Sequence, residues 1–221
     1  MNIRQTNPRR RGFTRIEVVV IVAVLALVAA LILAALTEPQ SNRKSGKINC
    51  VNNLKEIGIA VRIWEGDHDD KYPMEVPAAL GGAREMMATG NVVACFQVMS
   101  NELSSSKVLI CPSDAWHRAD TDENLAWVRL SRTNISYFMG LDAVESDPQA
   151  VLSGDANLVQ NRRVVPGGIV NLTTNITTWT RDRHDRAGNV LIADGSVQAL
   201  TEINSAAAPG AYASTNRVVV P

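Results

Sequence analysis

The longest hydrophobic pattern in the chain is an uninterrupted apolar run near its beginning. It extends from Val18 to Leu36, 19 residues without a charge, a proline or a glycine. A helix of that length measures roughly 28 Å, which is close to the hydrocarbon thickness of a bilayer. Because a helix satisfies its own backbone polar groups in lipid, the pattern predicts a transmembrane helix over residues 13–36.

A second, amphipathic pattern follows the apolar run. The polar segment 37–42 contains Pro39, which ends or kinks a helix. Apolar residues then recur at helical spacing, at Ile48, Val51, Leu54, Ile57, Val61 and Trp64. We therefore expect residues 37–65 to continue the first helix after a kink and to pack against a globular head.

Shorter patterns fill the remaining residues, 66–221, and predict a mixed head. A helical pattern covers 92–103, and strand patterns cover 107–111, 135–139 and 150–155. Residues 189–200 predict a hairpin, because Asp194 and Gly195 form a favoured two-residue turn. The C-terminal segment 204–221 is expected to form an edge strand or to hang loose. The fold class is therefore α+β, a long kinked N-terminal helix packed on a small antiparallel sheet.

The residues before the apolar run carry charge that bears on orientation. The basic residues are Arg4, Arg9, Arg10 and Arg11, which favours a cytoplasmic N-terminus and a head across the membrane. Glu17 is unusual, because an unpaired carboxylate at the start of a membrane helix is costly. Cleavage after Gly12 would give Phe13 a free amine on the same helix face as Glu17. That amine could pair with Glu17 of its own chain or of a neighbouring copy, which would make Glu17 an assembly residue.

These residues resemble a known signature. A basic leader (1–12) that ends in glycine, the string GFTRIE at 12–17 and about twenty apolar residues are similar to type IV prepilins and type II secretion pseudopilins. The resemblance implies cleavage after Gly12 by a prepilin peptidase and N-methylation of Phe13. Arg15 departs from the family pattern, in which an apolar residue is usual at that position.

A second resemblance lies near the other end of the chain. Nine residues lie between His184 and Asp194, which Gly195 follows directly. This H-x9-DG spacing resembles a C-terminal module associated with prepilin-type signals. Two internal strings, CVNNLKEIG at 50–58 and VLICPSD at 108–114, resemble the same pseudopilin-like group. We interpret His184 and Asp194 as a structural pair that hydrogen-bonds across the hairpin.

The cysteines indicate an oxidising compartment for the head, where disulfides persist. Of the three, Cys95 and Cys111 are closest in sequence, so their pairing is expected and Cys50 would be a buried thiol. Sequence alone does not fix disulfide connectivity, so the other pairings stay open. The spacing does not fit a zinc site, which needs closer Cys/His pairs.

An acidic turn provides the one metal candidate. Asp67, Asp69 and Asp70 offer carboxylate oxygens that could hold Ca²⁺, although a solvated acidic turn is the preferred interpretation. No other cofactor is expected. The net charge of the chain is zero and no basic face is evident, so a nucleic-acid partner is not expected.

The sequence thus favours a non-enzymatic filament subunit, a pseudopilin or pilin-like protein of the bacterial inner membrane with a periplasmic head. The resemblance implies as partners copies of itself, other pseudopilins, the prepilin peptidase, membrane lipid, and an assembly platform driven by a cytoplasmic ATPase. One alternative is a membrane-anchored periplasmic binding domain that does not polymerise. Another is a metal-dependent hydrolase that uses His184 and Asp194. An export signal peptide is a further interpretation of the N-terminus, but the apolar run is longer than a usual signal core.

Overall fold

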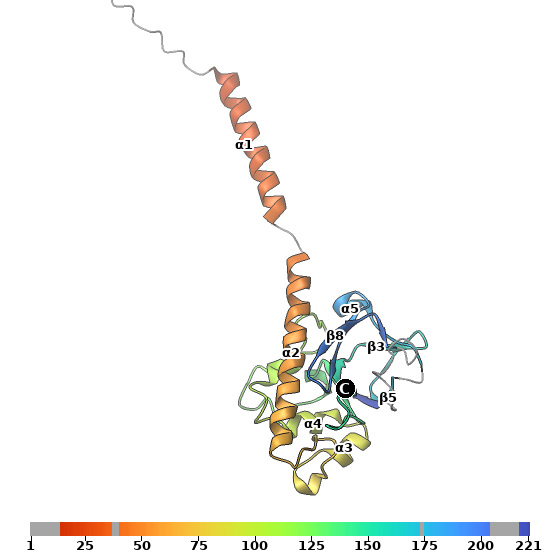
Figure 1. Ribbon diagram of the computed structural model, residues 1–221. Helices are drawn as coiled ribbons and strands as arrows, with labels where there is room; N and C mark the ends of the chain where they lie inside the picture. Colours follow the sequence, from red (N-terminus) through yellow and green to blue (C-terminus); the bar gives the residue numbers. More distant parts are fainter. Residues whose placement is uncertain (1–13, 37–39, 173–174, 204–216) are drawn as a thin grey trace, which may run out of the picture. The chain divides into compact units, whose positions relative to one another are not determined.

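The computed structural model describes residues 14–36, 40–172, 175–203 and 217–221 (Figure 1). The chain divides into two compact units, residues 1–41 and residues 42–221, and each is described by itself. The predicted leader 1–12 and Phe13 lie outside the described residues, as does the predicted kink at 37–39.

The first unit contains helix α1, Arg15–Leu36. Its window Arg15–Ile32 is the one stretch of the described chain that is helical, long and apolar enough to cross a membrane. All side chains from Thr14 to Ile32 are exposed. The prediction of an apolar helix of spanning length is therefore confirmed.

Helix α2, Gln40–Gly66, begins and ends close to its predicted limits. Its buried stripe consists of Cys50, Leu54, Ile57, Ala60, Val61 and Trp64. Ile48 departs from the predicted stripe, because 61% of its surface is exposed. Gly58 lets the helix approach the sheet closely, since a Cβ at this position would lie 3.2 Å from Leu191 Cδ2. The predicted packing of this amphipathic helix on the head is confirmed.

Short helices lie between α2 and the first strand and in the C-terminal third of the chain. They are η1 (Ala78–Leu80), α3 (Arg84–Ala88), α4 (Val92–Val98), η2 (Ser106–Leu109), η3 (Arg132–Asn134) and α5 (Arg181–His184). The predicted helix 92–103 is thus shorter than expected. The predicted strand 107–111 was wrong, because its first residues form η2, where the Ser105 hydroxyl caps the turn by accepting from the Lys107 N–H at 3.3 Å.

The strands form two antiparallel sheets. The larger sheet has the order β5-β10-β1-β2-β7-β8, and the smaller sheet has the order β4-β3-β6-β9. The larger sheet consists of β1 (Tyr137–Gly140), β2 (Val151–Asp155), β5 (Gly168–Asn171), β7 (Gly188–Ile192), β8 (Val197–Leu200) and β10 (Arg217–Val220). The smaller sheet consists of β3 (Leu158–Gln160), β4 (Arg163–Val164), β6 (Thr177–Trp179) and β9 (Glu202–Ile203).

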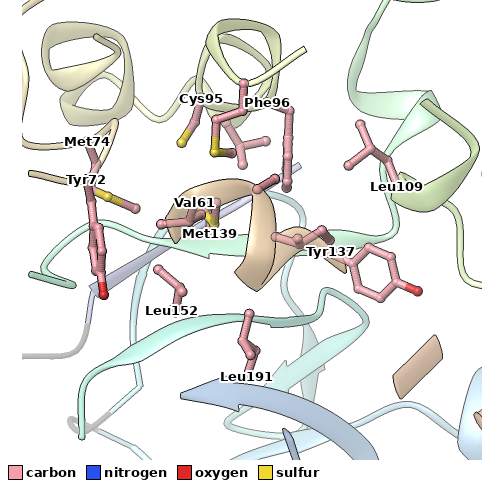
Figure 2. Packing of buried hydrophobic residues seen from close by; sticks show 14 of the residues in the cluster. Val61, Tyr72, Met74, Cys95, Phe96, Leu109, Tyr137, Met139, Leu152 and Leu191 are labelled. Carbon is pink, nitrogen blue, oxygen red and sulfur yellow. The ribbon is translucent and has the colours of Figure 1, made fainter. Parts of the chain in front are cut away.

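Both faces of the larger sheet are covered within the second unit. Side chains alternate between two clusters: Tyr137 and Met139 belong to the cluster with α2, whereas Phe138 belongs to the cluster with Leu158 and Trp179 of the smaller sheet. Figure 2 shows the first cluster, where side chains of α2 and α4 meet those of the sheet. The larger sheet therefore lies between a helical layer and a second sheet, and its inner strands are buried on both faces.

Two details of the predicted strands differ from expectation. The 189–200 hairpin forms, but its turn is not the predicted two-residue turn. Of the two predicted turn residues, Gly195 has a positive φ of 87° and Asp194 does not, and the Gly195 N–H donates to Ile192 O at 2.9 Å. This geometry is a longer turn that ends in a left-handed glycine. Strand β10 is not an edge strand, because it lies between β5 and β1 and buries Val218, Val219 and Val220.

Candidate functional site

The start of α1 is a capping box made by Thr14 and Glu17. The Thr14 N–H and hydroxyl donate to Glu17 Oε2 at 2.7 and 2.8 Å, and the Glu17 N–H donates to Thr14 Oγ1 at 3.3 Å. This reciprocal arrangement satisfies backbone donors that a helix start leaves free. Glu17 therefore has a local structural role that the sequence interpretation did not include. Gly12 and Phe13, the predicted processing residues, lie outside the described residues.

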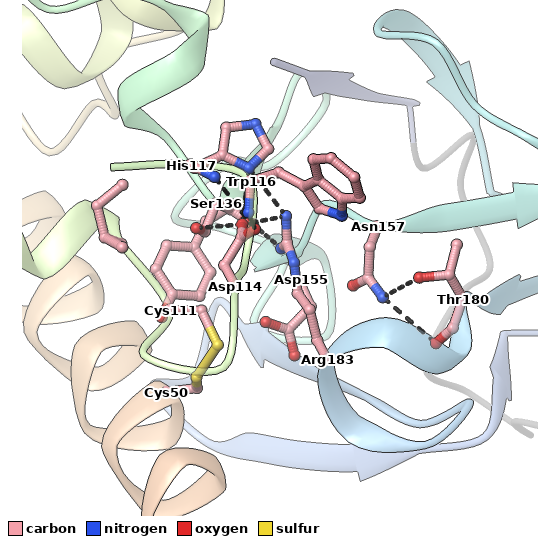
Figure 3. A network of polar contacts seen from close by, with 12 residues as sticks. Cys50, Cys111, Asp114, Trp116, His117, Ser136, Asp155, Asn157, Thr180 and Arg183 are labelled. Atoms are coloured by element: carbon pink, nitrogen blue, oxygen red, sulfur yellow. Dashed lines mark hydrogen bonds and ion pairs between the residues drawn. A yellow bond between two sulfur atoms is a disulfide. The ribbon is translucent and has the colours of Figure 1, made fainter. Parts of the chain in front are cut away.

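The disulfide joins Cys50 of α2 to Cys111, which follows η2 (Figure 3). The Cα atoms of the two cysteines are 5.1 Å apart, within the usual range for a disulfide. The predicted Cys95–Cys111 pair was wrong, because Cys95 is a free thiol buried in the helical layer on α4. Burial raises the pKa of the Cys95 thiol to about 12, so this thiol stays protonated at neutral pH.

A histidine and a carboxylate lie beside the disulfide. His184, the last residue of α5, places Nε2 3.4 Å from Cys111 Sγ and 3.6 Å from Asp155 Oδ2. Asp185 and Arg186, with φ of 54° and 66°, turn the chain sharply after α5 and into β7. Burial lowers the pKa of His184 and raises the pKa of Asp155, because a buried site disfavours the charged form of each group.

Asp155 is held rigidly at the end of β2. Its Oδ2 accepts from the Asn189 N–H at 2.7 Å and from Asn189 Nδ2 at 2.9 Å. Its carbonyl oxygen accepts from Trp179 Nε1 at 3.0 Å. Its Oδ1 is buried and has no hydrogen-bond partner among the described residues. A buried acceptor left without a partner is costly, so Oδ1 is a candidate ligand atom.

A second buried network lies around Asp114 (Figure 3). Asp114 Oδ2 accepts from Ser136 Oγ at 2.7 Å and lies 2.5 Å from Arg183 Nη2 and 2.7 Å from His117 Nδ1. Burial by itself would raise the pKa of Asp114, but the His117 hydrogen bond and the Arg183 charge outweigh burial and hold this pKa well below its usual range. The network ties the segment after Cys111 to Ser136, directly before β1, and to α5, which is a structural role.

The two halves of the predicted H-x9-DG module have different partners. His184 contacts Cys111 and Asp155, whereas the Asp194 carboxylate accepts from the Ser196 N–H at 2.8 Å. The structure therefore corrects the predicted hydrogen bond between His184 and Asp194. Among the described residues, Asp194 is also not one of the side chains close enough to share a metal ion with His184.

Asp194 and Gly195 instead line an open groove beside α2. The groove has a volume of about 450 Å³, and its other lining residues are Lys55, Gly58, Ile59, Arg62 and Ile63. Ile59 and Ile63 expose more than half of their surface here, 58% and 52%. The groove is a mainly apolar surface with two basic groups and one carboxylate.

The acidic turn after α2 is solvated. Asp67, Asp69 and Asp70 are exposed, and Asp69 and Asp70 have positive φ angles of 56° and 55°. Over the described ranges, the side chains close enough to share one metal ion are Cys50, Cys111, Asp155 and His184. The predicted Ca²⁺ residues are not part of that group.

No protein-family model, curated protein or solved structure matches this chain.

Proposed function

We propose that the chain is a structural subunit of a type II secretion pseudopilus or a type IV pilus-like filament. A prepilin peptidase would cleave it after Gly12, and Phe13 would become the methylated N-terminus. The observation that supports this proposal most directly is an acid, Glu17, at the start of an apolar helix whose side chains are exposed from Thr14 to Ile32. A helix of this kind needs a covering, either lipid or the same helix of other subunits.

The proposed assembly exchanges one apolar covering for another. Before assembly, α1 would lie in the inner membrane, and afterwards it would pack against α1 of neighbouring subunits. The exchange brings little hydrophobic gain, because lipid tails are as apolar as the helix surface. Polar pairing must therefore set the register, and we assign that role to Glu17 and the Phe13 amine of a neighbouring copy.

The head is consistent with this role. Its α+β fold, with helix α2 packed on an antiparallel sheet, is compatible with a pilin-like head. The Cys50–Cys111 disulfide suits a head that faces the oxidising periplasm. The proposed partners are other pseudopilins, the prepilin peptidase and the inner-membrane assembly platform, and the proposed role includes no catalysis.

The capping box provides a sharp test of Glu17. Glu17→Gln keeps an acceptor for Thr14 but removes the negative charge, whereas Thr14→Ala removes the cap and keeps the charge. If Glu17 pairs with an amine during assembly, Glu17→Gln loses incorporation into sheared filaments and Thr14→Ala retains it. Both variants should still be cleaved after Gly12. Loss of assembly in Thr14→Ala together with normal assembly of Glu17→Gln would assign Glu17 to capping alone.

The groove beside α2 favours one alternative, a membrane-anchored domain that binds a ligand and does not polymerise. A groove of about 450 Å³ is within the range of small-molecule sites. This alternative expects the leader 1–12 to persist in the mature protein and Ile59→Asp to abolish ligand binding. If the chain is a filament subunit, the leader 1–12 is absent from the mature protein.

A further inference from the structure

The two cysteines of the disulfide and two side chains beside it together have the composition of a zinc site. One ligand atom each from Cys50, Cys111, Asp155 and His184 lies within 4.8 Å of all the others. They come from α2, the segment after η2, the end of β2 and the end of α5, so the tertiary fold brings them together. We propose that reduction of the Cys50–Cys111 disulfide converts this cluster into a tetrahedral Zn²⁺ site with two thiolates, one imidazole and one carboxylate.

The distances already suit a shared ion. Ligand atoms bound at about 2.0–2.3 Å to a tetrahedral Zn²⁺ lie about 3.3–3.8 Å from one another. His184 Nε2 is 3.4 Å from Cys111 Sγ and 3.6 Å from Asp155 Oδ2. The distance between His184 Nε2 and Cys111 Sγ is therefore already that of two ligands of one ion, and the Asp155 carboxylate lies beside the imidazole. The main change that remains is the separation of the two sulfur atoms.

The carboxylate gives an independent indication of a ligand. Asp155 is completely buried, and its Oδ1 has no hydrogen-bond partner in the described part of the chain. Oδ2 receives both hydrogen bonds of Asn189, which fix the orientation of the carboxylate. A fixed carboxylate with a free oxygen is the arrangement that outer-shell hydrogen bonds give to metal ligands.

The redox step balances with a dithiol as the reductant. One thiolate of the dithiol attacks a sulfur of the Cys50–Cys111 bond and forms a mixed disulfide. The second thiol then displaces the protein sulfur, so the dithiol becomes a disulfide and the two protein cysteines receive two electrons and two protons. Zn²⁺ binding releases the two thiol protons, and neutral His184 and the Asp155 carboxylate complete the four ligands.

Either state links the same segments of the head. The disulfide joins α2 to the segment after η2, and the zinc ion would join these two segments and also β2 and α5. The metal would thus take the structural place of the disulfide in the reduced chain. This proposal is independent of filament assembly, because all four ligands belong to the head.

The test uses the full chain in detergent micelles under anaerobic conditions. The reduced and the oxidised forms are each titrated with Zn²⁺ against a chromophoric chelator, and the zinc complex is examined by X-ray absorption. The proposal expects one Zn²⁺ per reduced chain, with two sulfur ligands at about 2.3 Å and two nitrogen or oxygen ligands at about 2.0–2.2 Å. It expects at least hundredfold weaker binding by the oxidised chain. Equal binding by both forms, no binding by the reduced form, or a shell without sulfur would overturn it.

Variants assign the ligands. Asp155→Asn and His184→Gln should each weaken zinc binding by the reduced chain at least tenfold. The matched controls Cys95→Ser and His68→Gln should leave binding unchanged, since neither residue is in the cluster. If a variant fails to fold, the visible absorption spectrum of the reduced wild type loaded with Co²⁺ shows whether the cysteines bind the metal. Thiolate charge-transfer bands and tetrahedral visible bands support the proposal, and an octahedral spectrum without thiolate bands contradicts it.

Discussion

Arg183 Nη2 lies 2.5 Å from Asp114 Oδ2, and the two side chains expose 4% and 0% of their surface. The pair joins α5 to the segment that follows Cys111, 69 residues earlier in the chain, and Arg183 Nη1 also donates to Ser136 O at 2.6 Å. A fully buried pair contributes little net stability compared with apolar residues, but loss of one partner leaves a buried charge alone. The folded position of the segment between Cys111 and β1 therefore depends on both Arg183 and Asp114.

Asp114→Asn should destabilise the head strongly. The substitution keeps the shape of the side chain but removes the carboxylate that pairs directly with the buried Arg183 guanidinium, and breaking a buried pair costs about 3–5 kcal/mol. Urea unfolding of the full chain in detergent, followed by tryptophan fluorescence, measures the loss. The exposed Asp182→Asn on α5 is the matched control and should change the free energy of unfolding by less than about 0.5 kcal/mol. Equal effects of the two substitutions would contradict the account of this network.

The lowered pKa of the Asp114 carboxylate predicts that the stability of the head depends on pH. The pKa of Asp114 is lower in the folded chain than in the unfolded chain, so the folded state releases this proton more readily. The stabilisation is therefore fully present above the unfolded pKa of about 4 and decreases as the pH falls below it. The difference in urea midpoint between wild type and Asp114→Asn should shrink between pH 6 and pH 3. A difference that stays constant over this range would show that the Asp114 charge does not act through the network.

The disulfide connectivity can be read directly. Proteolysis without reductant should release a peptide pair that links Cys50 to Cys111, and Cys95 should react with a thiol reagent only after unfolding. The crosslink spans 61 residues, and in the chain-entropy model a loop of this size contributes about 4 kcal/mol. The double variant Cys50→Ala/Cys111→Ala should lose stability of this order. A linked pair that contains Cys95 would contradict the connectivity.

The turn between β7 and β8 requires its glycine. Gly195 has φ of 87°, in the left-handed region, and open space surrounds the position of a Cβ. Gly195→Ala should therefore cost about 1–2 kcal/mol through backbone strain alone. Gly195→Asn should cost less than Gly195→Ala, since asparagine tolerates this conformation better. Urea midpoints of the two variants provide the comparison, and equal losses would mean that strain is not the cause.

Local patterns predicted much of this fold. The apolar run of α1, the helical period of α2 and the strands β2, β7 and β8 lie close to their expected limits, because each depends on the spacing of neighbouring residues. The inner position of strand β10 was not predicted, because the apolar pattern of Val218 to Val220 does not reveal which strands pair with it. Its place between β5 and β1 depends on pairing with residues far away in the sequence.

The polar clusters were largely beyond prediction from sequence. Cys111 is closer in sequence to Cys95 than to Cys50, and the fold reverses this relation by placing α2 against the segment after η2. His184 was singled out through its spacing to Asp194, but its partners are Asp155 and Cys111. Arg183, directly before His184, carried no signal, because an arginine in a polar stretch usually indicates a solvated surface and not a buried pair.

The central claim is that the chain is processed and that its new N-terminus meets Glu17 of a neighbour. The most direct measurement is the intact mass and N-terminal peptide of the protein isolated from its native membrane. The proposal predicts a chain that begins with methylated Phe13 and lacks residues 1–12. A mature protein that still carries the arginine-rich leader would contradict the claim, because the amine that Glu17 needs would not exist.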